Sequence, residues 1–120
     1  KVELMMKRAL ELDEGFYYGG PHLFMGIRLA SRSALAGGNL AKAQQHFLRA
    51  LELGQGKFLM AYVYYANYYA RQAQDKELFI SILQTVLNTP ADISSDLTLL
   101  NTVAREKAKD LLDRQEEYFD

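Results

Sequence analysis

The sequence predicts an all-α fold built as a helical repeat, and three observations support this prediction. Apolar residues recur three and four positions apart along almost the whole 120-residue chain, which is the spacing of one face of an α-helix. No segment alternates apolar and polar residues for long enough to indicate a strand. The pentapeptide RALEL at residues 8–12 recurs letter for letter at residues 49–53. Repeats of roughly 20 to 50 residues indicate stacked helical units that bury their apolar faces on their neighbours.

The first two helices are expected over residues 1–13 and 21–34. Gly15 suits the end of the first helix, because glycine readily adopts the left-handed conformation found after a helix C-terminus. Pro21 suits the start of the second helix, since its missing N–H would be unpaired in a first helical turn anyway.

The next two helices are expected over residues 40–54 and 56–72. The pair at residues 37–38, both glycine, marks the turn before them. Asn39 follows that turn and is a typical N-cap residue. The connections between helices are short, so neighbouring helices are expected to pack antiparallel.

Two further helices are expected over residues 75–88 and from Ser94 or Ser95 to about Tyr118. Pro90 ends the fifth helix because proline cannot continue the hydrogen-bond ladder. Either serine can cap the sixth helix. The apolar stripe of the sixth helix consists of Leu97, Leu100, Ala104, Ala108 and Leu111. Its other side is polar, and a long final helix with a polar outer face is typical of the cap of a solenoid.

Composition excludes several classes of protein. The formal net charge is -1, so the total charge gives no electrostatic footprint for nucleic acid or an anionic membrane. The chain has no cysteine, which excludes disulfides, thiolate metal sites and cysteine nucleophiles. No apolar run approaches the roughly 20 residues of a membrane span. We expect one domain over residues 1–120, a piece of a longer chain, because the sequence opens directly on a helical pattern.

Signatures of catalysis and of cofactor binding are missing from the sequence. It contains no G-x-G-x-x-G, Walker, H-E-x-x-H or nucleophile-elbow motif. His22 and His46 have no carboxylate partner at metal-ligand spacing, so no metal site is expected. We expect His22 to cap or pack at a helix start and His46 to face solvent. The sequence therefore predicts a protein that is not an enzyme and that needs no cofactor.

The second helix of a tetratricopeptide (TPR) repeat carries a small residue, an aromatic residue four later and an alanine three after that. Ala43, Phe47 and Ala50 match this pattern, so the repeat is expected to be a divergent TPR. In a TPR the first helix of each pair lines the concave surface. The groove positions on the two such helices are Leu23, Ile27, Ser31, Ala61, Tyr64, Tyr68, Arg71 and Gln72.

The fourth helix carries two aromatic stripes, although a buried seam needs only one. Phe58, Tyr62, Tyr65 and Tyr69 form the first stripe, and Tyr64 and Tyr68 belong to the second. Tyrosine offers a large apolar face with one hydrogen-bonding tip, and arginine can hold a carboxylate by two parallel hydrogen bonds. The second stripe therefore predicts an amphipathic ligand with a carboxylate. The alternative is that Tyr64 and Tyr68 pack in the core under a neighbouring helix.

Five segments of the chain resemble the TRAP-transporter T-component (TatT) family. They are residues 19–26 (GGPHLFMG), 30–32 (ASR), 37–38 (GG), 56–59 (GKFL) and 69–72 (YARQ). The resemblance implies a periplasmic, lipid-anchored TPR protein of a tripartite ATP-independent periplasmic (TRAP) transporter, which imports organic acids and related solutes. It implies binding of the substrate-binding P component, a hydrophobic ligand in the groove and a homotrimer. The resemblance also implies that the chain is the C-terminal part of such a protein. The lipid-modified cysteine would lie upstream, since this chain has none.

A second interpretation of the same features is a generic TPR adaptor. Divergent repeats and a groove that ends in an arginine serve equally well to clamp a peptide of another protein. The sequence leaves open whether the groove takes a small molecule or a peptide.

Overall fold

The computed structural model describes residue 4 and residues 16–119, so the helix expected over residues 1–13 lies outside the described residues. The described part consists of helices joined by turns and short loops and contains no strand, which confirms the all-α prediction. Its α-helices are α2 (Phe16–Ser31), α3 (Leu40–Gly54), α4 (Leu59–Tyr64), α5 (Lys76–Leu87) and α6 (Thr98–Asp113). A π-helix, Tyr65–Ala70, continues α4 directly.

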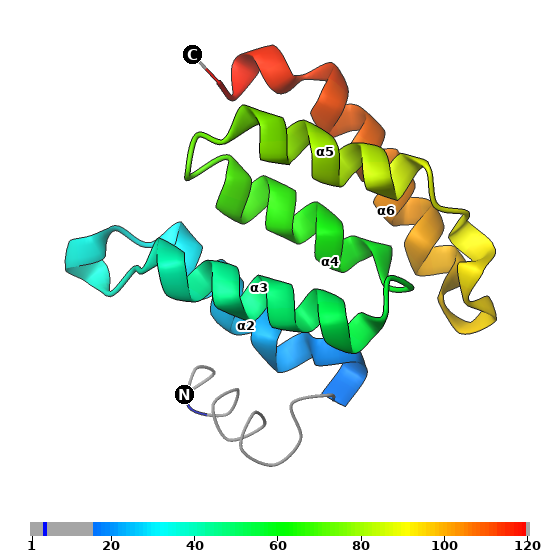
Figure 1. Ribbon diagram of the computed structural model, residues 1–120, viewed down its shortest axis with the longest axis horizontal. Coiled ribbons are helices and arrows are strands. Elements are labelled where there is room, and N and C mark those ends of the chain that lie inside the picture. Colours follow the sequence, from blue (N-terminus) through cyan, green and yellow to red (C-terminus); the bar gives the residue numbers. More distant parts are fainter. Residues whose placement is uncertain (1–3, 5–15, 120) are drawn as a thin grey trace.

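Consecutive helices run antiparallel and stack along the molecule (Figure 1). The chain advances from the α2–α3 pair through α4 and α5 to α6, and each turn between helices reverses its direction. Contacts are densest between α2 and α3, and α6 packs on both α4 and α5. A stack of this kind is the helical repeat that the sequence predicts, because each hairpin buries its apolar face on the next.

The core combines a few large side chains with alanines at the helix crossings. Phe47, Phe79 and Leu83 are fully buried. Within the described residues, seven alanines are fully buried as well: Ala30, Ala43, Ala50, Ala66, Ala70, Ala104 and Ala108. Gly26 lets α2 approach α3 closely, because a Cβ atom there would lie 2.9 Å from the Phe47 ring. The crossing of α2 and α3 therefore depends on one small residue facing one large residue.

Local signals place the boundaries of α3 and α5 correctly, whereas α4 starts at Leu59 and not at residue 56. Asn39 caps α3, its Oδ1 accepting a hydrogen bond from the Lys42 backbone N–H at 3.0 Å. Asp75 caps α5 in the same way, accepting from the Leu78 N–H at 3.1 Å. Gly37 has a φ of 95° in the turn before α3, a left-handed conformation that favours glycine.

The boundaries of α2 differ from the prediction. α2 is expected to start at Pro21, but it already begins at Phe16 and contains this proline. The backbone is nevertheless left-handed just before the proline, at Tyr18 and Gly19. At its other end α2 stops at Ser31, because a short 3₁₀ helix, Ala34–Ala36, takes over the chain.

The start and the buried face of α6 also differ from the prediction. Neither Ser94 nor Ser95 caps it, because a 3₁₀ turn, Ser95–Leu97, intervenes and α6 starts after Leu97 without a side-chain cap. α6 ends at Asp113, and a second 3₁₀ turn, Gln115–Glu117, leads to Tyr118. Leu100 is 37% exposed, whereas the adjacent Asn101 is fully buried. The prediction places Leu100 in the buried stripe of α6, but Asn101 occupies that position.

Candidate functional site

A π-helix runs through the tyrosine-rich segment. Its wider turn is visible where the Arg71 backbone N–H donates to the Ala66 carbonyl, five residues earlier, at 3.2 Å. π-helices are rare and are found often at functional sites. The α-helical periodicity used to sort the tyrosines into stripes therefore holds only as far as Tyr64.

The tyrosines on the inner side of this segment belong to the core. Tyr65 is 4% exposed, its ring stacks on Phe47 at 5.5 Å, and its hydroxyl accepts a hydrogen bond from Gln44 Nε2 at 3.0 Å. Burial raises the pKa of Tyr65 above its ordinary value. Tyr69 lies beside it with the ring centroids 5.4 Å apart. These two tyrosines are packing residues.

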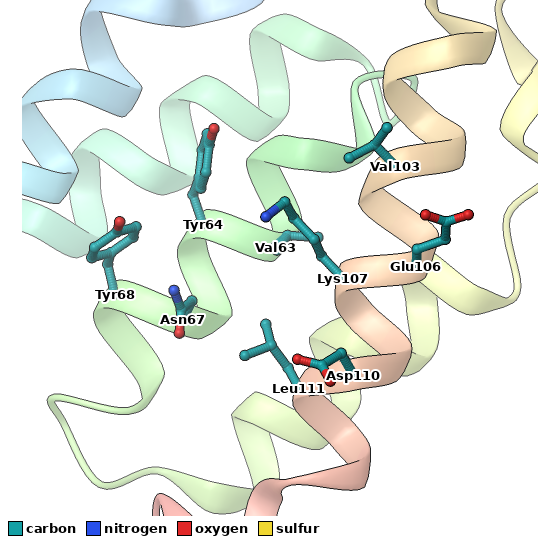
Figure 2. Close-up of a pocket in the computed structure, with 9 residues that line it drawn as sticks. All are labelled: Val63, Tyr64, Asn67, Tyr68, Val103, Glu106, Lys107, Asp110 and Leu111. Carbon is teal, nitrogen blue, oxygen red and sulfur yellow. The ribbon is translucent and has the colours of Figure 1, made fainter.

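Tyr64 and Tyr68 lie on the other side, half-buried, with ring centroids 6.1 Å apart. They line a cavity of about 510 Å³ between α4, the π-helix and α6 (Figure 2). The lining residues are Val63, Tyr64, Asn67, Tyr68, Val103, Glu106, Lys107, Asp110 and Leu111. Both rings also touch the edge of the core, so each phenol has one packed side and one side that faces the cavity.

A second cavity of about 400 Å³ lies at the other end of the π-helix. Its lining residues are Ala30, Ser31, Asn67, Tyr68, Arg71, Gln72, Gln74 and Tyr118. Asn67 and Tyr68 line both cavities. The two cavities therefore adjoin at these residues, and we call them together the groove.

Arg71 is held at the wall of the second cavity by two neutral neighbours. Its Nη1 donates to Asn67 Oδ1 at 2.8 Å, and its Cζ lies 3.7 Å from the centroid of the Tyr118 ring, a cation–π contact. Tyr118 is fixed in turn, because its carbonyl accepts from Gln74 Nε2 at 3.2 Å. Within residues 16–119, no carboxylate forms an ion pair with Arg71.

Charged side chains of α6 form the far rim of the first cavity. In Figure 2, Lys107 points across the cavity towards Tyr64, while Glu106 points away from α4. Asp110 lies beside Leu111 and pairs with Arg114 at 3.7 Å. This rim carries two carboxylates and one ammonium group, whereas the second cavity carries only the guanidinium.

The residues predicted for the groove divide into two groups. Five of them line the groove: Ser31, Tyr64, Tyr68, Arg71 and Gln72. Leu23 and Ala61 are only 5% and 1% exposed and lie in the core. Ile27 is half-buried and packs against the same core. These three do not line either cavity.

Several residues that line the groove were not among the predicted ones, including Asn67, Lys107, Leu111 and Tyr118. Asn67 stands four residues before Arg71, a spacing at which side chains meet on a helix, so a local signal existed. Tyr118, Lys107 and Leu111 come from the far end of the chain. No local sequence pattern predicts that these three residues lie near the π-helix.

His22 and His46 form a pair between α2 and α3. Their Nδ1 atoms lie 2.8 Å apart, a distance at which one donates a hydrogen bond to the other. His46 is half-buried, so the expectation that it faces solvent is wrong. Burial lowers the pKa of His46 below its ordinary value, and the nearby His22 and Lys42 lower it further. In the described part of the chain, no group of three or more metal-ligating side chains comes together.

Comparison with known proteins identifies the family. No curated protein sequence matches the chain. No helix among the described residues is long and apolar enough to cross a membrane. A family profile described as "TRAP transporter T-component" matches residues 1–119. The chain therefore belongs to the TRAP transporter T-component family, whose members are periplasm-associated accessory proteins of these transporters.

Proposed function

We propose that this protein is a non-enzymatic, periplasmic TPR accessory that binds the substrate-binding P component of its transporter. The protein also binds a small hydrophobic or organic-acid ligand in the groove. The observation that supports the ligand most directly is the arrangement of Tyr64, Tyr68 and Arg71 along the groove, in a chain of the T-component family.

The chemistry of the groove favours recognition over reaction. Its walls offer phenol faces, the amides of Asn67 and Gln72, and the Arg71 guanidinium. Concave, partly apolar sites with a few convergent polar groups bind small molecules and fix their orientation. A P component that delivers an organic acid would need a partner site of this kind.

Anchoring and assembly are part of the proposal. A lipid-modified cysteine upstream of residue 1 would tether the protein to the membrane, and three copies would associate as a homotrimer. Both features come with the family.

The central experiment mixes the full-length protein with the P component encoded beside it and looks for a complex by native mass spectrometry. We expect a complex with the cognate P component and none with the P component of an unrelated TRAP transporter, which is the matched control. No complex under any ligand condition would contradict the accessory role.

The alternative occupant of the groove is a peptide of another protein. Amide side chains such as Asn67 and Gln72 can bind the backbone of an extended peptide, and both line the groove. Photo-crosslinking from position 72 in the full-length protein separates the two cases. Attachment to a segment of a protein other than the P component would favour the adaptor function.

A further inference from the structure

We propose that the ligand of the groove is an amphipathic carboxylate with a single negative charge. Its carboxylate would bind Arg71 in the second cavity, and its apolar part would lie between the π-helix and α6 in the first. This inference rests on the proposed ligand-binding role of the groove and adds the chemical class and the orientation of the ligand.

The first argument is the uncompensated charge of Arg71. A guanidinium has five N–H donors, and the contacts described above use one of them, to Asn67, while Tyr118 offers only a ring face. A half-buried cation without an anionic partner is unfavourable, because no ion-pair attraction offsets the free energy that its desolvation costs. A ligand carboxylate would supply the missing charge and accept two parallel hydrogen bonds.

The second argument is that Arg71 is already positioned before any ligand arrives. Asn67 holds one edge of the guanidinium and the Tyr118 ring holds one face. The cavity beside it is otherwise neutral and is lined by hydroxyl, phenol and amide groups such as Ser31 and Gln72. A preorganised cation among neutral donors selects an anion at little conformational cost.

The third argument is the contrast between the two cavities. The first is lined by Val63, Val103 and Leu111 as well as by the two phenols, so it suits an apolar moiety. Tyr68 lines both cavities. One molecule can therefore extend from Arg71 along Tyr68 into the apolar part without leaving the groove.

The rim of the first cavity offers little to a second anionic group. Glu106 points away from α4 and Asp110 is paired with Arg114, so Lys107 is the charged side chain of the rim that faces the cavity. Lys107 is exposed and therefore solvated, so it compensates a second carboxylate weakly. A dicarboxylate consequently gains little over a monocarboxylate of the same length.

The test is isothermal titration calorimetry of the full-length protein with four probes of equal chain length. These are octanoate, 1-octanol, octanedioate and octylammonium. We expect octanoate to bind at least about tenfold more tightly than 1-octanol or octylammonium, as is typical of a hydrogen bond to a charged group. Octanedioate should bind no more tightly than octanoate.

Two variants with the same charge change locate the carboxylate. Arg71→Gln should reduce the preference for octanoate over 1-octanol to about threefold or less. Lys109→Gln removes a positive charge from an exposed residue of α6 that lines neither cavity and should leave that preference intact. Arg71→Lys keeps the charge but loses the planar fork, so its preference should be intermediate. If Arg71→Gln does not fold, Arg71→Lys and the four probes on the unaltered protein decide the question.

Equal affinity for octanoate and 1-octanol, or a preference that survives Arg71→Gln, would overturn the inference and leave a groove that binds ligands. Tighter binding of octanedioate that depends on Lys107 would overturn the single-charge assignment. Failure of all four probes would overturn the inference altogether. Native mass spectrometry with the P component would then show independently whether the accessory role stands.

Discussion

At the scale of single residues, Asn101 fixes the junction of three segments. Its Oδ1 accepts from the Leu59 backbone N–H at 3.0 Å, and its Nδ2 donates to the carbonyls of Lys57 at 2.8 Å and Ala91 at 3.2 Å. Phe58 precedes α4 without a side-chain cap, so α6 supplies the cap that the local sequence lacks.

Replacing Asn101 should be costly. Asn101→Leu keeps the branched shape but leaves one buried N–H and two carbonyls without their partner, so we expect a loss of about 3 kcal/mol of unfolding free energy. Urea denaturation followed by circular dichroism measures it. Asn88→Leu, at an exposed asparagine, is the control and should change stability by less than about 1 kcal/mol. Equal effects of both changes would contradict the role of Asn101.

The pair of His22 and His46 makes stability depend on pH. Because the pKa of His46 is lowered in the folded state, the unfolded chain binds a proton first as the pH falls below about 6.5. The contribution of this group is therefore fully present above that pH and decreases as the pH falls towards the folded-state pKa.

We expect the unfolding free energy to be lower at pH 5.5 than at pH 7.5, and we expect His46→Gln to flatten this difference. Urea titrations at the two pH values measure it. Lys42→Gln should flatten the difference only slightly, since Lys42 is the smallest of the three causes of the shift. An unchanged pH dependence in His46→Gln would show that other groups produce it.

At the scale of elements, the π-helix separates packing tyrosines from groove tyrosines. Tyr65 stacks on Phe47 within the core, and Tyr68 lines both cavities. Two tyrosines that stand three positions apart therefore have different roles.

Alanine substitutions should separate these purposes. Tyr65→Ala should lower the unfolding free energy by about 3–5 kcal/mol, the range for deleting a buried aromatic side chain. Tyr68→Ala should cost distinctly less and should weaken binding of octanoate. Denaturation and calorimetry on both variants test this. A loss of several kcal/mol in Tyr68→Ala would instead support the core interpretation of the second stripe.

The crossing of α2 and α3 depends on Gly26. Alanine is the better helix former by about 1 kcal/mol, but its Cβ would lie 2.9 Å from a ring that is itself fully buried. We expect Gly26→Ala to destabilise the protein by about 1–3 kcal/mol. Gly54→Ala, whose Cβ would lie 3.5 Å from Phe58, is the matched control and should be nearly neutral. Combining Gly26→Ala with Phe47→Leu should show less than additive loss in urea denaturation.

At the scale of the whole molecule, the groove brings together distant parts of the chain. Ser31 ends α2, Arg71 follows the π-helix, and Tyr118 follows the 3₁₀ turn after α6. The C-terminal segment is held by Phe79, whose ring lies 6.0 Å from Tyr118 and 5.1 Å from Phe119. The end of the chain is thus both a cover for the core and a wall of the groove.

A double-mutant cycle tests the contact between Arg71 and Tyr118. Arg71→Gln and Tyr118→Leu should show a coupling energy of about 0.5–1 kcal/mol, the range of a partly exposed cation–π contact. The second cycle combines Arg71→Gln with Tyr118→Phe. Its coupling energy should be close to zero, because phenylalanine keeps the ring that contacts the guanidinium. Additive effects in the first cycle would mean that the ring and the guanidinium do not stabilise each other.

The sequence by itself determines the all-α class, the boundaries of α3 and α5, and the family, because these depend on short-range features. The caps at Asn39 and Asp75 bind backbone groups three residues away, and Gly37 adopts its turn for local steric reasons. Tyr64 and Tyr68 were assigned to one stripe for the same reason, since they stand four residues apart in the sequence, a spacing at which side chains meet on a helix.

Only the tertiary structure decides which of these surfaces meet. Asn101 replaces Leu100 in the core because its three backbone partners lie on other segments. His46 is half-buried because α2 brings His22 to it, and Arg71 meets Tyr118 because the chain end folds back. Such contacts join residues that are far apart in sequence, so they depend on the angles at which helices cross, and no periodicity along the chain records those angles.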